Sequence, residues 1–364
     1  MAYHVVIFGA MITPYTNELY NELLKSGLNI SYLACTEQET NRNWTNTFKP
    51  NYSHRVLRGW HLRLSSSRFA HINIGIMTAL SEMKPDLLII SGFFPSMIIG
   101  VFWSMITGTK FGLTSDGWRH TMSQSIYHQI IRPWVLRRCS VVIACGVKGR
   151  DYFVEEGLSP EVVHVVPLNP AWSAPERIPD FRNRVFDILW CGHINNDVKN
   201  VNFFVDVCIE LKKRISDLRV RIIGSGPEET VVFSRLAREK IEFKHDKSLP
   251  WNEMAKVYLE SKILLFPSVW EAWGLVCNEA LQCGVPCIVS PFVGAGDDLI
   301  KDGQTGYVVP LEATTWATKA EAVLRDSRLW SALSNSGLKR VRQNSIRNSS
   351  MAFLNAVEFA KNRW

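Results

Sequence analysis

Short runs rich in valine, isoleucine and leucine recur along the chain, and a mixed polar and apolar segment of helical length follows each of them. Such a run is typical of a strand in a parallel sheet, and the segment after it of the helix that leads to the next strand. The runs therefore predict an α/β protein built from βαβ units. They are HVVIFGA from residue 4, NISYLAC from 29, DLLIISG from 86, KFGLTS from 110, SVVIACG from 140, FDILWCG from 186, RVRIIGSG from 219, IEFKH from 241, KILLFPS from 262, PCIVS from 286 and GYVVP from 306.

A proline-rich segment, VPLNPAWSAPERIPDFRNR at residues 166–184, separates the runs into two groups. Prolines disfavour regular structure, and 364 residues are too many for one core. We therefore expect an N-terminal domain at 1–168, a linker at 169–184 and a C-terminal domain at 185–345. A closing helix is expected at 346–364, because one helical face is apolar there: Phe353, Leu354, Val357, Ala360 and Trp364. Two doubly wound domains would face a central cleft, and such sheets bind ligands beyond the carboxyl ends of their strands.

One apolar stretch, Leu87 to Ile106, is long enough to span a bilayer. It contains Ser91 and Gly92 after the first few residues, Pro95 suits a helix start, and Gly108 suits a helix end. We therefore predict a strand, a turn and a buried helix rather than a transmembrane helix.

The eight cysteines form no C-x-x-C pair, and several lie inside apolar runs. This distribution favours buried, reduced thiols in a cytoplasmic protein. The first residues resemble a strand rather than a signal peptide.

A net charge of +7 suits an anionic partner, such as a nucleotide, a lipid headgroup or nucleic acid.

The segment from Arg42 to Arg68 has no acidic residue and mixes basic with aromatic side chains. One interpretation is a solvated face with aromatic residues in the core. The other is contact with a polyprenyl-diphosphate acceptor or with an anionic membrane on its inner face. No motif typical of nucleic-acid-binding proteins accompanies these basic residues, which argues against a nucleic-acid partner. The residues are Arg42, Lys49, Arg55, Arg58, Arg63 and Arg68, with Trp44, Phe48, Tyr52, Trp60 and Phe69.

The segment SVWEAWGLVCNEALQCGVPCI, residues 268–288, places Glu271 and Glu279 around Gly274, where a strand gives way to a helix. Gly274 permits close approach of the backbone, and the N–H groups of Leu275 and Val276 would begin a helix, which is a favourable position for a phosphate. On residue type alone, Glu271 could instead cap the loop and Glu279 could lie on a helix surface.

The surroundings of these glutamates resemble the retaining glycosyltransferases of the GT-B fold, especially family 4 (glycosyl transferases group 1). In that family an E-x(7)-E motif follows a strand that ends in Pro-Ser. The match here includes Pro267-Ser268, Glu271, Gly274, Glu279-Ala280 and CGVP at 283–286, and it continues through DDLIKDGQTGYVVP at 297–310. The resemblance is strong from about Phe186 to Pro310. It implies two Rossmann-like domains, with the last helix crossing back to the first domain.

The resemblance also implies roles for individual residues toward a nucleotide-diphosphate sugar. Lys199 would bind the donor diphosphate, and His193 stands where the family usually has arginine. Glu279 would bind the ribose hydroxyls, and Glu271 would lie against the transferred sugar. The turn of Gly224, Ser225 and Gly226 would leave room for the nucleotide.

The first domain departs from the family pattern. Relatives often have a glycine-rich loop after the first strand, whereas this chain keeps only Gly9 and would place Met11 and Ile12 in the cleft. Where relatives often show a His-Asp pair, this chain has Ser115 and Asp116. Asp116 could contact the acceptor or cap its loop, and His120 is a weaker candidate.

No D-x-D motif lies in a metal-binding context, so we expect neither a metal nor another cofactor. The implied activity is hexosyl or glycosyl transfer in polysaccharide or glycoconjugate synthesis. Two alternatives remain: a related enzyme with another reaction, such as a sugar-nucleotide epimerase or a phosphorylase, and a nonenzymatic sugar-binding protein.

Overall fold

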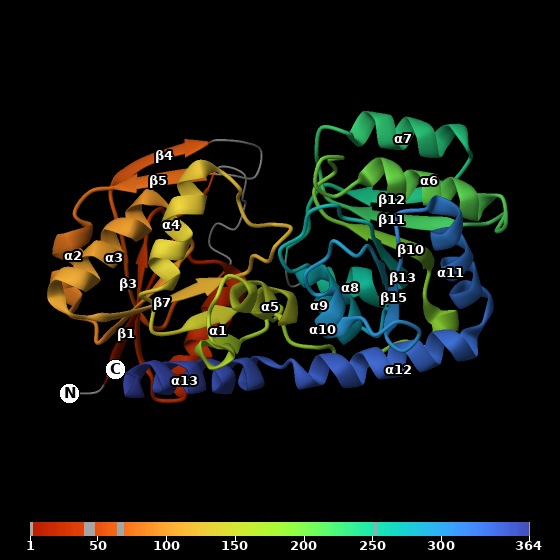
Figure 1. Ribbon diagram of the computed structural model, residues 1–364. Helices are drawn as coiled ribbons and strands as arrows, with labels where there is room; N and C mark the ends of the chain where they lie inside the picture. Colours follow the sequence, from red (N-terminus) through yellow and green to blue (C-terminus); the bar gives the residue numbers. More distant parts are fainter. Residues whose placement is uncertain (1–2, 40–47, 64–68, 251–252, 364) are drawn as a thin grey trace. The chain divides into compact units, whose positions relative to one another are not determined.

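The computed structural model describes residues 3–39, 48–63, 69–250 and 253–363. Its chain divides into two compact units, shown in Figure 1: Met1–Ala171 with Ser345–Trp364, and Trp172–Asn344. We call them unit 1 and unit 2. Four residues considered above lie outside the described residues: Arg42, Trp44, Arg68 and Trp364.

Unit 1 is built on a parallel sheet with the strand order β3-β2-β1-β6-β7-β8-β9. A separate antiparallel hairpin is formed by β4 and β5. The bounds are β1 (His4–Gly9), β2 (Asn29–Ala34), β3 (Ser53–Val56), β4 (Gly59–Arg63), β5 (Phe69–Asn73), β6 (Leu87–Ser91), β7 (Lys110–Ser115), β8 (Val142–Ala144) and β9 (Val163–Val165). The helices are α1 (Pro14–Lys25), α2 (Ile76–Met83), α3 (Pro95–Thr107), α4 (Ile126–Leu136), α5 (Val147–Glu155) and α13 (Ile346–Asn362), with a 3-10 turn at Pro160–Val162.

Successive residues of β1 point to opposite faces of this sheet, and helices cover both faces. Val6 and Phe8 pack in one core with residues of α2, α3 and α5. Val5 and Ile7 pack in the other core with residues of α1 and α13. The closing helix α13 lies against α1 in unit 1, as Figure 1 shows, and Ser349 Oγ donates to the carbonyl of Pro167 at 2.9 Å. This is the doubly wound arrangement that continuous apolar strands require.

Unit 2 has a parallel sheet with the order β12-β11-β10-β13-β14-β15. Its core lies between this sheet and helices that include α6 and α11. The strands are β10 (Phe186–Cys191), β11 (Arg219–Ile223), β12 (Glu242–Asp246), β13 (Ser261–Phe266), β14 (Cys287–Val289) and β15 (Gly306–Val308). The helices are α6 (Val201–Lys212), α7 (Glu229–Arg238), α8 (Met254–Leu259), α9 (Leu275–Gln282), α10 (Gly296–Leu299), α11 (Ala313–Arg325) and α12 (Ser327–Gln343), with a 3-10 turn at Phe181–Asn183.

Each predicted apolar run is a strand, so the predicted α/β class with parallel sheets is confirmed. The long apolar stretch forms β6 and α3, and Gly108 ends α3 with a φ of 71°. Among the described residues, every helix is too short or too polar to cross a membrane. All eight cysteines are buried and free, as expected.

Candidate functional site

The loop after β13 lies at the carboxyl edge of the unit 2 sheet and is held on both sides. Val269 N–H donates to the Val198 carbonyl at 2.9 Å, which ties the loop to the segment after β10. On the other side, Glu271 forms a β-bridge with Val293, and Gly294 N–H donates to the Glu271 carbonyl at 3.1 Å. The backbone of Glu271 therefore has a defined position between two neighbouring strand ends.

Lys199 and Glu271 meet at this edge. Lys199 Nζ donates a hydrogen bond to Glu271 Oε2, and the two side chains are only 20% and 16% exposed. The ammonium also lies 5.0 Å from the centre of the Phe266 ring, and Lys199 N–H donates to Asn195 Oδ1 at 3.0 Å. A partly buried ammonium of this kind can bind a phosphate oxygen, although Glu271 would then have to share it.

The helix α9 begins beside this ion pair. Gly274 has a φ of 101°, in the left-handed region that glycine tolerates best. A Cβ at this position would lie 3.0 Å from Val293 Cγ1 and 3.4 Å from Glu271 Cγ, so a side chain would crowd the loop. The helix starts at Leu275 and Val276, whose N–H groups belong to its unsatisfied first turn. This end carries the positive side of the helix dipole.

Glu279 lies one turn into α9 and is partly buried. Its Oε2 accepts a hydrogen bond of 2.7 Å from the hydroxyl of Tyr258, which is fully buried on α8. Burial raises the pKa of Glu279 to about 7, although the Tyr258 hydrogen bond opposes this rise. Burial also raises the pKa of Tyr258 well above its usual value, so Tyr258 remains a donor. Hydroxyl donors from a bound ligand would stabilise the Glu279 carboxylate.

The turn after β11 is close to the segment after β10. Gly224 has a φ of 134°, and a Cβ there would lie 1.8 Å from the Gly192 carbonyl oxygen. A Cβ on Gly226 would lie 2.2 Å from the Ile194 carbonyl oxygen, and the Ser225 carbonyl accepts from Ile194 N–H at 2.9 Å. Packing between two loops therefore explains these glycines without any ligand. His193, in the same region, is exposed.

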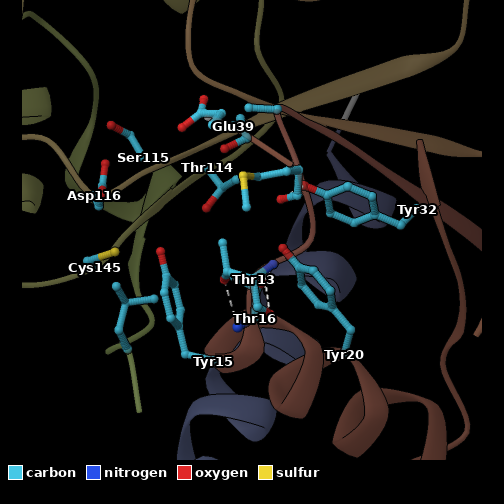
Figure 2. Close-up of a pocket in the computed structure, with 14 residues that line it drawn as sticks. Thr13, Tyr15, Thr16, Tyr20, Tyr32, Glu39, Thr114, Ser115, Asp116 and Cys145 are labelled. Carbon is cyan, nitrogen blue, oxygen red and sulfur yellow. Dashed lines mark hydrogen bonds between the residues drawn. The ribbon is translucent and has the colours of Figure 1, made fainter. Parts of the chain in front are cut away.

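Asp116 follows β7 in unit 1 and lines a cavity of about 210 Å³ at the carboxyl ends of the strands. Figure 2 shows it beside Thr114 and Ser115. Met11 also lines the cavity, whereas Ile12 packs in the core with α1, so the expectation for Ile12 was wrong. His120 is exposed, and its ring lies 5.4 Å from that of Trp118.

Sequence reasoning missed several residues of both sites. Tyr258 was not predicted, because it reaches Glu279 across 21 positions and has no motif of its own. Glu39, Tyr15 and Tyr20 line the cavity of unit 1 but lie in segments without a recognisable signal.

Comparison with known proteins places these features in context. Residues 177–340 match the family model for glycosyl transferases group 1. N-acetyl-alpha-D-glucosaminyl L-malate synthase of Bacillus anthracis is 31% identical over 140 residues, which are 38% of this chain and 36% of that protein. The chain thus aligns with only about a third of this relative's length.

Solved structures match nearly the whole chain. Anabaena HepE in complex with UDP and glucose has a TM-score of 0.73 and 12% identity, covering 98% of this chain and 99% of that one. The pneumococcal O-GlcNAc transferase GtfA in complex with UDP and GlcNAc has a TM-score of 0.74 and 11% identity, covering 99% of each chain. The chain therefore has the GT-B fold, and its residues 177–340 correspond to the glycosyl transferases group 1 model.

Proposed function

We propose that this protein is a retaining glycosyltransferase of family 4. It would move a sugar from a nucleotide-diphosphate sugar to a hydroxyl of a glycan or lipid-linked glycan, in the synthesis of a polysaccharide or glycoconjugate. One observation carries this proposal. Lys199, Glu271 and the start of α9 lie together at the carboxyl edge of the unit 2 sheet, and Glu279 lies on the same helix. The two solved structures compared above are complexes with UDP, which makes UDP-sugars the first donors to test.

The proposed donor contacts follow from charge and hydrogen-bonding capacity. Lys199 and the N–H groups of Leu275 and Val276 would bind the diphosphate, whose negative charge grows as the sugar leaves. Glu279 would accept from the two ribose hydroxyls, because a carboxylate has two acceptor oxygens. Glu271 would face the sugar and stabilise positive charge that develops at the anomeric carbon. The bound nucleotide would also have as neighbours His193 and the turn of Gly224, Ser225 and Gly226.

We also propose that unit 1, which would bind the acceptor, works at an anionic membrane surface. One face of the β4–β5 hairpin presents Trp60, Leu62 and Ile72, which are 63%, 54% and 40% exposed. The exposed Arg58 precedes this hairpin, whereas Arg55 is paired with Glu82 at 2.7 Å. Aromatic, aliphatic and basic side chains together suit the headgroup region of a bilayer.

The test of the function is turnover of a panel of nucleotide sugars in the presence of glycan acceptors, with proton NMR of the first product formed. We expect nucleotide release that depends on the acceptor, and the anomeric configuration of the donor in the product. An inverted linkage would overturn the retaining mechanism. Conversion of the donor sugar without transfer would indicate an epimerase, and a need for orthophosphate would indicate a phosphorylase. Binding without turnover would indicate a sugar-binding protein.

A further inference from the structure

The cavity in unit 1 is lined mainly by hydroxyl groups, tyrosines and carboxylates, with a few apolar residues. Besides hydroxyl groups from Thr13, Thr114 and Ser115, it has tyrosines at positions 15, 20 and 32 and carboxylates at Glu39 and Asp116. Figure 2 shows the hydroxyl ends of Tyr15 and Tyr20 pointing toward the side of the cavity where Thr114 and Asp116 lie. The volume of about 210 Å³ is below the roughly 300–1,000 Å³ of pockets for drug-sized ligands, so the cavity suits one ring.

The charge of this lining is opposite to the charge of the whole chain. The described residues around the cavity include two carboxylates but no lysine, arginine or histidine, although the chain carries a net charge of +7. A phosphate or carboxylate group entering here would meet like charges, and none of the described lining residues would offer it a cationic side chain. Like charges in a partly enclosed space repel more strongly than they do in water.

Glu39 is held in the cavity wall by a chain of two histidines. His71 Nε2 lies 3.2 Å from Glu39 Oε1, and His71 Nδ1 lies 3.0 Å from Nδ1 of the exposed His61. His71 itself is fully buried, between the rings of Phe69 and Phe94. Because an ionised carboxylate only accepts, His71 donates its Nε2–H to Glu39. The carboxylate therefore has a defined place in the wall.

A sugar ring without charged substituents complements these groups. Its hydroxyls can donate to Glu39 and Asp116 and can exchange hydrogen bonds with Thr114 and Ser115. Its C–H face can pack against tyrosine rings. A site built to bind hydroxyl groups discriminates strongly against analogues that leave its polar groups unpaired.

We propose that this cavity binds the acceptor as one uncharged, hydroxyl-rich sugar ring and rejects rings that carry a phosphate or a carboxylate. The inference rests on the proposed transferase function and names the acceptor class of its unit 1 site. In a lipid-linked acceptor, the diphosphate would then lie outside the cavity. Glu39 and Asp116 would be the residues that set this selectivity.

The experiment compares three forms of each of the gluco, galacto and manno rings: the methyl glycoside, the 6-phosphate and the uronate. Transfer is measured as nucleotide release by the full-length protein, and binding by saturation-transfer NMR. We expect kcat/KM to be about tenfold or more higher for the methyl glycoside than for its anionic counterparts. The double variant Glu39→Gln/Asp116→Asn should reduce this ratio at least severalfold, whereas the exposed acid variant Asp151→Asn should not.

Equal or better use of the anionic rings by the parent protein would overturn the inference, and so would an unchanged ratio in the folded double variant. Absence of nucleotide release with every donor and acceptor would instead count against the proposed transferase. In that case the NMR comparison still decides the inference, because selective binding of the neutral rings must be lost in the double variant.

Discussion

The ion pair between Lys199 and Glu271 makes Lys199 the most direct single-residue test of the donor site. Lys199→Ala removes a charge-assisted hydrogen bond to the diphosphate, typically worth about 1.5–3 kcal/mol, so UDP affinity should fall roughly ten- to a hundredfold. Isothermal titration calorimetry would measure the change. Lys213→Ala is a matched control, because Lys213 is 63% exposed and also paired with a glutamate. Unchanged affinity in folded Lys199→Ala would reject the role of Lys199.

The raised pKa of Glu279 should make the free energy of unfolding depend on pH. Its pKa is about 7 in the folded protein, against an ordinary value of 4.5. Between these values the folded state binds more protons than the unfolded state, so stability falls as the pH rises. Glu279→Gln cannot ionise and should raise the free energy of unfolding by about 1–3 kcal/mol at pH 8, with a smaller gain at pH 5.

Denaturant titrations at the two pH values would measure this difference for Glu279→Gln. The same variant should raise the donor KM, because the ribose hydroxyls lose an anionic acceptor. A gain in stability that is equal at pH 5 and pH 8 would contradict the raised pKa as its cause.

Substitutions of Glu271 and Glu279 should change different kinetic constants if Glu271 faces the transferred sugar. Charge on that sugar grows in the transition state, so Glu271→Gln should mainly lower kcat, whereas Glu279→Gln should mainly raise the donor KM. Steady-state kinetics at varied donor concentration separates the two effects. Defects in KM alone for both variants would rule out the role of Glu271.

At the scale of elements, the β4–β5 hairpin provides the test of membrane contact. Trp60→Ser with Arg58→Gln should weaken sedimentation with anionic vesicles, because each basic residue near such a surface contributes about 1 kcal/mol and Trp60 adds apolar area. Val231→Ser is a suitable control, since Val231 is 48% exposed on α7 in unit 2. Salt should also weaken binding. Sedimentation that survives both the salt and the changes would show that this hairpin face is merely solvated.

For the whole molecule, we expect glycosyl transfer to continue in the presence of a chelator. Lys199 and the start of α9 would neutralise the negative charge of the leaving diphosphate, so the reaction would not need a metal ion. Assays with and without EDTA, in metal-free buffer, measure this directly. Loss of activity in EDTA that Mg²⁺ or Mn²⁺ restores would mean that a metal ion shares the diphosphate.

Most of the fold could be predicted because central parallel strands are continuous apolar runs, and their pattern is local. Some strands outside these apolar runs were missed. β3 (Ser53–Val56) is exposed at every position, and β9 (Val163–Val165) is fully buried at only one of its three positions. For the candidate site, the motif located Glu271, Gly274 and Glu279 in sequence, but it carried no information about their partners.

The sequence by itself determined the α/β class, the positions of the main strands along the chain and the glycine at the start of α9, because these depend on local apolar patterns and backbone conformation. Only the tertiary structure decided which side chains meet. Lys199 reaches Glu271 across 72 positions, and His71 reaches Glu39 across 32. The same folding placed two carboxylates around one cavity of a chain whose net charge is positive. Parallel strands bring distant segments to one sheet edge, so charge and hydrogen bonding there depend on topology and not on neighbours in sequence.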